Sequence, residues 1–295
     1  MDLLKIKGNT FFIDAPTNIG IFSFRNKNCL IIDTGINNTQ AHKILEVIET
    51  AGLHPKFIFN THSHPDHCAG NRVFRDNYPG IIIHASHGTK LFMENPDVYA
   101  TGLFAAKAPG TIFRTSHPHS ADIEVADGPC KIGEEKFNIF KLNGHAPDQL
   151  GIMTPDHVLF CGDAVFSKDT IAKYRIPYIH DAAAYLASLA MLKQIPAEAY
   201  MIGHSCPPME QDKFTDLVNI NIQNLNDCSD LIIDLCAQPQ TKESLLENLI
   251  SLFDIEVDEL QYMLDFASIS ALVSMLLDSG QLKVEIQNGR MYFFA

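Results

Sequence analysis

The chain has 295 residues, of which 46% are hydrophobic and 19% are charged. This balance excludes disordered and fibrous classes and predicts a globular protein with a large domain and a smaller one. The formal net charge of -13 argues against nucleic acid as a partner, because nonspecific binding to phosphate backbones requires Lys and Arg to displace counterions.

The first part of the chain alternates short apolar runs with a helical pattern. The runs at 11–13, 19–24, 29–32 and 57–59 are bounded by polar turn residues, which predicts strands. Residues 39–51 repeat apolar positions on one face and precede a glycine, which predicts a helix. We therefore expect a mixed α/β architecture in which a strand leads directly into the histidine-rich segment that follows residue 59.

A second group of elements follows a long irregular stretch. After a strand at 81–84, residues 88–124 mix aromatic residues with Pro and Gly and are interpreted as a lid over a binding site. His117 and His119 lie within it as an apparent ligand pair. Further strands are predicted at 137–142, 151–153, 158–160 and 199–202, with a helix at 182–194 before the last of them.

The sequence pattern changes near residue 211 from alternating strands and helices to helices. Helical patterns cover 212–236, 241–253 and 257–278, the last with a polar break near Ser268, and two short strands at 282–286 and 291–294 flank an Asn-Gly turn. Helices followed by a hairpin resemble a winged helix, so we divide the chain into domains 1–210 and 211–295. The second carries 4 basic and 14 acidic residues, which argues against reading DNA and favours docking onto the first domain or homodimerisation.

Four polar residues that can bind metal lie within six positions after the strand at 57–59. They are His62, His64, Asp66 and His67. One loop thus delivers several nitrogen and oxygen ligands to a small volume, as Zn, Fe or Mn sites require.

Three further candidates, His145, Asp163 and His204, each follow a strand-like run in a turn-like setting. They can therefore lie on loops at one edge of a sheet. Five histidines and two carboxylates exceed the needs of one tetrahedral ion and suit two.

The pattern HxHxDH, followed by single His, Asp and His residues, resembles the ligand pattern of the metallo-β-lactamase superfamily over about residues 10–210. The resemblance implies a four-layer αββα sandwich, here with a small, mainly helical C-terminal domain. It also implies that His62, His64 and His145 hold one metal, that Asp66, His67 and His204 hold the other, and that Asp163 bridges them. Zinc is the expected metal, with iron or manganese as alternatives.

An aspartate rather than a cysteine in the bridging position resembles the glyoxalase II and lactonase branches more than the zinc β-lactamases, and the intact His64 argues against the flavodiiron branch. The implied activity is hydrolysis of a small ester, thioester or lactone, with a metal-bridging hydroxide as nucleophile. Asp66 is the candidate catalytic residue, which would orient the hydroxide or pass its proton on. The alternative is an oxidoreductase similar to the persulfide dioxygenases, with a single iron.

Other residues are candidates for supporting roles. Asp33 either fixes the tautomer of a ligand histidine or is a simple turn carboxylate. Tyr174 and Tyr178, with Arg175 and His180, follow Asp163 where members of this superfamily often place substrate contacts. The C-terminal third has very few of the Lys and Arg with which glyoxalase II holds glutathione. This argues against glutathione thioesters and leaves the substrate open.

The seven cysteines form no CxxC pair, which favours reduced thiols. Cys68, Cys161 and Cys206 lie beside candidate metal ligands. The first residues lack the features of a secretory signal, and the longest uninterrupted apolar runs are shorter than the roughly 20 residues of a membrane span. We therefore expect a cytoplasmic protein that acts on a small-molecule substrate and does not associate with a membrane.

Overall fold

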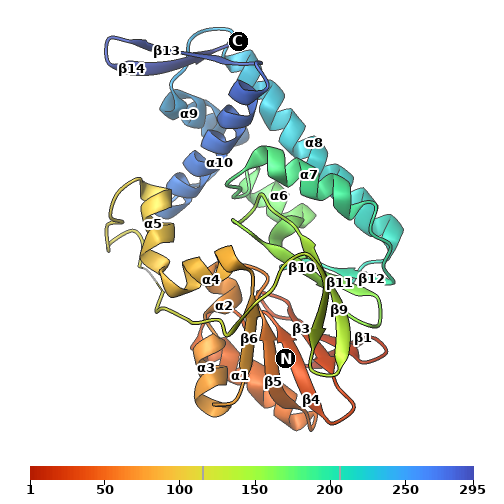
Figure 1. The fold of residues 1–295 in the computed structure, drawn as a ribbon. Helices are drawn as coiled ribbons and strands as arrows, with labels where there is room; N and C mark the ends of the chain where they lie inside the picture. Colours follow the sequence, from red (N-terminus) through yellow and green to blue (C-terminus); the bar gives the residue numbers. More distant parts are fainter. Residues whose placement is uncertain (115, 206) are drawn as a thin grey trace.

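The computed structural model describes residues 1–114, 116–205 and 207–295. Two β-sheets lie face to face with helices outside each, and a helical region with a terminal hairpin extends from one end (Figure 1). The predicted four-layer α/β sandwich with a helical C-terminal region is therefore confirmed.

The first sheet contains seven strands within the described residues, in the order of the chain. They are β1 Leu3–Lys7, β2 Thr10–Ile13, β3 Ile19–Ser23, β4 Asn28–Ile32, β5 His54–Phe59, β6 Ile82–Ala85 and β7 Ile123–Glu124. β1 to β4 pair antiparallel, and β4 to β7 pair parallel. Because strand side chains alternate between faces, Ile31 packs with helices α1 (Asn38–Thr50) and α3 (Asn71–Asn77), whereas Leu30 and Ile32 face the second sheet.

The second sheet contains five strands within the described residues, in the order β12-β11-β10-β9-β8. They are β8 Gly128–Ile132, β9 Glu135–Lys141, β10 Leu150–Met153, β11 Val158–Phe160 and β12 Ala199–Met201. Phe137 and Phe160 join Phe22 in the core between the sheets. The sheets approach so closely at Gly20 that a Cβ there would lie 2.5 Å from the Phe160 ring.

Three helices cover the outer face of the second sheet: α6 (Lys168–Tyr174), α7 (Ala182–Leu192) and α8 (Gln211–Leu235). The Tyr200 ring of β12 stacks on Phe214 of α8, with ring centroids 4.1 Å apart. The same apolar cluster continues into α9 (Lys242–Phe253) and α10 (Glu259–Asp278) through Leu249 and Leu272. The helical region thus shares its core with the sheet.

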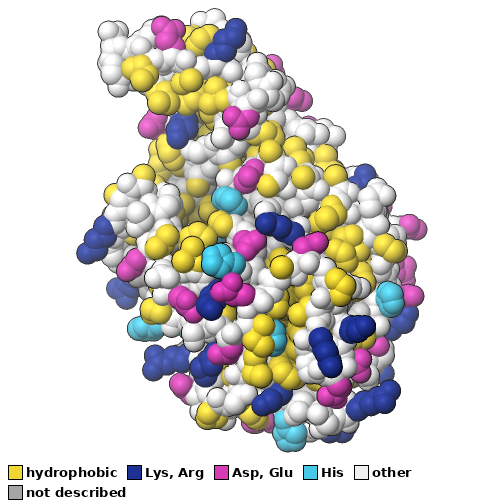
Figure 2. Space-filling model, viewed as in Figure 1, with side chains coloured by type: hydrophobic (Ala, Val, Ile, Leu, Met, Phe, Trp, Pro, Cys, Tyr) yellow, Lys and Arg dark blue, Asp and Glu magenta, His cyan; other side chains and the backbone are white. Residues whose placement is uncertain are grey.

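The chain ends in the hairpin of β13 (Lys283–Gln287) and β14 (Arg290–Phe294). The observed order of helices followed by a hairpin agrees with the sequence prediction. The predicted break near Ser268 is wrong, since α10 continues through this residue. The buried Ser268 hydroxyl is satisfied within the helix by a hydrogen bond to the Leu264 carbonyl. Figure 2 shows hydrophobic side chains gathered on this region and few Lys or Arg. The winged-helix comparison, the boundary at residue 210 and a homodimer stay predictions.

Among the described helices, α10 is long and apolar enough to cross a membrane by length and composition alone. It packs against α5, α7, α8 and α9. Core helices of globular proteins pass the same test.

The predicted lid, residues 88–124, is more regular than its sequence suggests. It contains α4 (His87–Glu94) and α5 (Pro96–Phe104). The Ser86 side chain caps α4, and Pro96 begins α5. Because a break at residue 95 separates two short helices, neither has room for a clear helical repeat. α5 packs against α10.

Candidate metal centre

Neighbouring parallel strands bring the candidate ligands together. Asp33 follows β4, His62 lies three residues after β5, and Asp163 and His204 follow β11 and β12. β4 pairs parallel with β5, and β11 with β12, so each pair delivers its following residues to one sheet edge. A short helix, α2 (Pro65–Cys68), begins after His64 and carries Asp66 and His67.

The structure brings all seven predicted ligands into two adjacent groups. The first contains His62, His64 and His145, and the second contains Asp66, His67, Asp163 and His204. Within each group the candidate ligand atoms lie within 4.8 Å of one another. Each group has enough donors to hold a metal ion.

Hydrogen bonds fix the tautomers of three candidate ligand histidines. The Nδ1 of His145 donates to the Tyr178 carbonyl at 2.8 Å, that of His204 to the Pro16 carbonyl at 2.6 Å, and that of His67 to Asp33 Oδ2 at 2.8 Å. The Nε2 of each ring is therefore the nitrogen that can bind a metal ion. Ligand histidines in metal sites are commonly oriented in this way.

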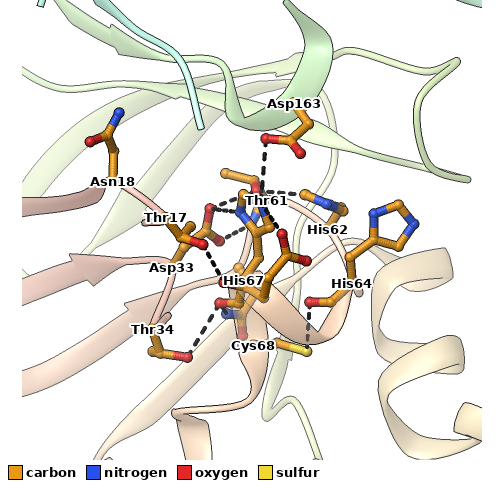
Figure 3. A network of polar contacts seen from close by, with 12 residues as sticks. Thr17, Asn18, Asp33, Thr34, Thr61, His62, His64, His67, Cys68 and Asp163 are labelled. Atoms are coloured by element: carbon orange, nitrogen blue, oxygen red, sulfur yellow. Dashed lines mark hydrogen bonds and ion pairs between the residues drawn. The ribbon is translucent and has the colours of Figure 1, made fainter. Parts of the chain in front are cut away.

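Asp33 is the centre of this orientation (Figure 3). Its Oδ1 accepts the backbone N–H of Thr61, and its Oδ2 accepts both the Thr61 hydroxyl and the His67 Nδ1, each at 2.8 Å. Since the Thr61 hydroxyl gives its only proton to Asp33, it can only accept from His62 Nδ1, 3.0 Å away. Asp33 thus sets the tautomer of His67 directly and that of His62 through Thr61.

The donor set fits metal ions of the zinc type. The Nε2 atoms of His62 and His64 are buried and lack a hydrogen-bond partner among the described residues. His64 Nδ1 and His145 Nε2 lie 2.9 Å apart, and His67 Nε2 and His204 Nε2 lie 3.2 Å apart. Two nitrogens bound to one zinc at ideal distances would lie roughly 3.3 Å apart, so the rings are nearly placed for ligation.

Asp163 touches both groups. Its Oδ2 lies 3.6 Å from His145 Nε2 and 3.2 Å from His204 Nε2, while its Oδ1 lies 3.3 Å from His67 Nε2. Gly203 makes this position accessible, because a Cβ at residue 203 would lie 1.9 Å from Asp163 Oδ1. A carboxylate so placed can reach an ion in either group.

The two groups differ in the pKa values of their histidines. Burial lowers the pKa of His64 to about 3 and also lowers that of His62. In the second group burial acts against the charge, yet the Asp163 and Asp33 carboxylates raise the pKa of His67 to about 10. Asp163 likewise raises the pKa of His204 to about 12. The second group therefore attracts positive charge, and a metal ion must displace protons there to bind.

A cavity of about 400 Å³ opens beside the two groups. Its wall combines ligands, aromatic residues and two oppositely charged side chains: Asp66, His145, Asp163, Phe166, Asp169, Thr170, Lys173, Tyr174, Pro177, Tyr178, His204, Ser205, Gln261 and Leu264. Tyr174 and Tyr178 thus line the cavity beside the ligands. Arg175 and His180 are not among these residues, and the Arg175 guanidinium lies over the Phe253 ring instead.

The family model of the metallo-beta-lactamase superfamily matches residues 13–204, which contain the whole candidate centre. The chain belongs to this superfamily. The resemblance predicted from the ligand pattern is therefore confirmed.

Curated relatives of this superfamily member include glyoxylase B2 of Dictyostelium discoideum, which is 24% identical over 227 residues that cover 71% of this chain and 70% of the relative. A hydroxyacylglutathione hydrolase of Gloeobacter violaceus is 35% identical over 28% of this chain and 35% of the relative. Hydroxyacylglutathione hydrolase 1 of Vibrio vulnificus is 26% identical over 49% of this chain and 46% of the relative. The chain thus spans less than half of the two hydrolases.

Two solved structures share the fold over nearly the whole chain. A beta-lactamase domain protein from Burkholderia ambifaria has a TM-score of 0.75 at 16% identity, covering 99% of this chain and 93% of its own. A metallo-beta-lactamase family protein from Thermus thermophilus has a TM-score of 0.75 at 18% identity, covering 97% of this chain and 98% of its own. The shared fold therefore includes the C-terminal helices.

Sequence reasoning missed several residues of this metallo-beta-lactamase site. Tyr99 of α5 lies with its ring 5.3 Å from that of His64 and donates a hydrogen bond to Tyr178. Gln261 and Leu264 of α10 complete the cavity wall. Only the aromatic content of residues 88–124 pointed to Tyr99. The sequence around α10 carries no sign of a site.

The other residues singled out from the sequence lie outside the two groups. Cys68 and Cys161 are buried, and burial raises the pKa of each thiol. His117 and His119 line a separate hollow with Arg72. Cys206 lies outside the described residues.

Proposed function

We propose that the protein is a binuclear metal-dependent hydrolase of a small ester, thioester or lactone. The observation that carries this proposal is the convergence of seven candidate metal-binding side chains in two adjacent groups, with four of them, Asp66, His145, Asp163 and His204, in the wall of one cavity. Relatives that are named hydroxyacylglutathione hydrolases support hydrolysis of an acyl compound.

The groups suggest the assignment of the ligands. His62, His64 and His145 would hold one ion, Asp66, His67 and His204 the other, and Asp163 would contact both. Imidazole and carboxylate donors suit zinc best, with iron or manganese as alternatives. Two divalent ions held by these residues would lower the pKa of a water molecule and polarise a substrate carbonyl.

Two residues of the cavity wall can then act on the water molecule and on the substrate. Asp66 lines the cavity with its side chain 43% exposed and its Oδ2 3.2 Å from His204 Nε2. Although burial acts the other way, His67 lowers the pKa of Asp66, so Asp66 is a carboxylate at neutral pH and can orient a water molecule or accept its proton. Burial raises the pKa of Tyr178, so its hydroxyl stays protonated and can donate to a substrate oxygen.

Asp33 is the residue that we assign to positioning. Its hydrogen bonds to His67 and Thr61 hold one histidine of each group in the tautomer that a metal requires. No observation favours the mononuclear iron alternative, because the second group offers donors for a second ion.

The test combines metal analysis with a substrate screen. Protein purified without added metal is analysed for metal identity and stoichiometry, and the metal-loaded protein is assayed with thioesters, lactones, β-lactams and phosphodiesters, with His64→Ala as the blank. We expect two ions per chain and hydrolysis of a thioester, ester or lactone that the variant lacks. One iron per chain with oxygen uptake on a persulfide, or no metal-dependent hydrolysis, would overturn the proposal.

A further inference from the structure

Helix α10 contributes a polar side chain to the wall of the cavity that four of the candidate metal ligands also line. Gln261 lies in the first turn of α10 and, with Leu264, lines the cavity. Its Nε2 donates to Oδ1 of Asp265, one turn further along, at 2.7 Å. Asp265 is only 1% exposed.

The chemistry of this pair fixes which end of the amide is free. An ionised carboxylate can only accept hydrogen bonds, so the NH₂ of Gln261 faces Asp265. Among the described residues, no donor is hydrogen bonded to Gln261 Oε1. The amide carbonyl is therefore the acceptor that Gln261 can offer to a molecule in the cavity.

Asp265 is an unusual residue because it is a buried carboxyl group whose hydrogen-bond partner among the described residues is Gln261 alone. Its Oδ2 is buried without a hydrogen-bond partner among the described residues, and burial raises its pKa to about 7. Burying such a carboxyl group is unfavourable. Its placement next to a cavity residue suggests that its use is to hold the Gln261 amide.

The charges of the wall restrict the kind of ligand. Apart from the metal-binding groups, the charged residues of the wall are Asp169 and Lys173. The Lys173 ammonium group already donates to the Tyr174 hydroxyl at 2.9 Å. Away from the candidate metal ligands the wall thus carries one cation and one carboxylate, whose charges oppose each other. Neutral hydrogen bonds are the other means of recognition that this part of the wall offers.

We propose that Gln261 determines specificity by accepting a hydrogen bond from an N–H or O–H of the substrate, and that Asp265 is its positioning residue. The substrate class is an ester or thioester with an uncharged group that carries such a donor beyond the scissile bond. The proposal rests on the proposed hydrolase function.

The test compares substrates that differ by a single donor. S-lactoyl-N-acetylcysteamine carries a hydroxyl in its acyl part and an amide N–H in its leaving group. S-propanoyl-N-acetylcysteamine lacks the hydroxyl, and the S-lactoyl thioester of 2-acetoxyethanethiol lacks the N–H. Assays at pH 8.5, above the pKa of Asp265, keep its carboxyl group ionised.

The variant is Gln261→Met, and the matched control is Gln223→Met. Gln223 lies on α8, is exposed, and donates from Nε2 to Asp227 Oδ1 at 2.7 Å with the same spacing of four residues. We expect Gln261→Met to lower kcat/KM about tenfold for the substrate with both donors, as the loss of one hydrogen bond predicts. It should leave kcat/KM within about twofold for the analogue that lacks the recognised donor, and the control should match the wild type throughout.

The outcomes separate the two proposals. If the metal-loaded wild type hydrolyses the thioesters but Gln261→Met keeps the wild-type ratio between each pair, only the role of Gln261 is overturned. If the wild type hydrolyses none of the screened classes, the hydrolase function fails and this inference fails with it. The analogue over which the substrate with both donors loses its advantage in Gln261→Met identifies the recognised donor as the acyl hydroxyl or the leaving-group N–H.

Asp265 is tested by its own pair of variants. Asp265→Leu fills the buried position with an apolar side chain of similar size and removes the acceptor. Asp265→Asn can still accept from Gln261 through its amide carbonyl. We expect Asp265→Leu to raise KM for the donor-bearing substrate several-fold with little change in kcat, and Asp265→Asn to restore much of the loss. Equal KM values in wild type and Asp265→Leu, with melting temperatures and metal contents also equal, would overturn the positioning role.

Discussion

Asp33 accepts the Nδ1 proton of His67 at 2.8 Å across 34 positions of the chain. This bond leaves His67 Nε2 directed at Asp163 Oδ1, 3.3 Å away. One carboxylate therefore orients a ring whose other nitrogen meets a second carboxylate, and each of the two positions can be tested separately.

Replacing Asp33 should weaken metal binding without removing a ligand. In Asp33→Asn one acceptor oxygen becomes an NH₂ group, which faces either the Thr61 N–H or the donors of Thr61 and His67 and cannot accept from them. We therefore expect metal affinity to fall about 10- to 100-fold. Competition with a chromophoric chelator measures it. Asp14→Asn, at an exposed position, is the control; equal affinities in the two variants would show that Asp33 does not support the site.

Removal of Asp163 should affect both ions, whereas removal of His204 should affect one. Asp163 lies within 3.6 Å of ring nitrogens in both groups, but His204 belongs only to the second. We expect less than one ion per chain in Asp163→Ala and about one in His204→Ala, measured by elemental analysis after dialysis. Full occupancy in Asp163→Ala would count against its contact with both ions.

Gly203 should not tolerate even a methyl group. A Cβ there would lie 1.9 Å from Asp163 Oδ1 and 3.0 Å from His67 Cε1. Displacing these side chains should cost about 1–3 kcal/mol of stability and reduce metal content. Gly102→Ala is the control, because a Cβ at Gly102 meets nothing within 4 Å; calorimetry and metal analysis of the two variants should differ clearly.

Asp265 should make stability fall as pH rises. Burial raises its pKa from 3.8 to about 7, so the folded chain binds this proton more tightly than the unfolded chain. Its contribution is most favourable below about pH 4, declines between pH 4 and 7, and is fully lost above pH 7. Asp265→Asn should match the wild type near pH 4 and exceed its free energy of unfolding by about 4 kcal/mol at pH 8, because a rise in pKa from 3.8 to about 7 corresponds to that difference.

Urea unfolding of both proteins at several pH values measures this difference. Subtracting the two curves removes the contribution of all other titrating groups. A difference that stays constant from pH 4 to pH 8 would contradict the raised pKa.

The convergence of the seven candidate ligands was predictable because each lies in a short local pattern. His62 to His67 occupy six consecutive positions, and His145, Asp163 and His204 follow apolar runs that become strands. Strand ends lie at sheet edges, so the sequence was enough to place these residues together.

The rest of the site depends on contacts that no local pattern contains. Tyr99 reaches His64 and Tyr178 only because α5 folds back against α10, and Gln261 reaches the cavity across about a hundred residues from Asp163. From the sequence, Asp33 could equally be a simple turn carboxylate. Its hydrogen bonds to Thr61 and His67 form only because β4 pairs with β5. Such contacts come from packing, which the order of residues does not reveal.

Ser268 has a consequence for how the cavity meets its ligand. Its hydroxyl oxygen accepts the N–H of Ile179 at 3.1 Å and lies 3.3 Å from the Pro177 carbonyl oxygen, so α10 is fastened to the segment that carries Tyr178. This contact restrains the wall that holds Gln261 relative to the wall that holds Tyr178. Restraint that exists before a ligand arrives reduces the conformational entropy that is lost when one binds.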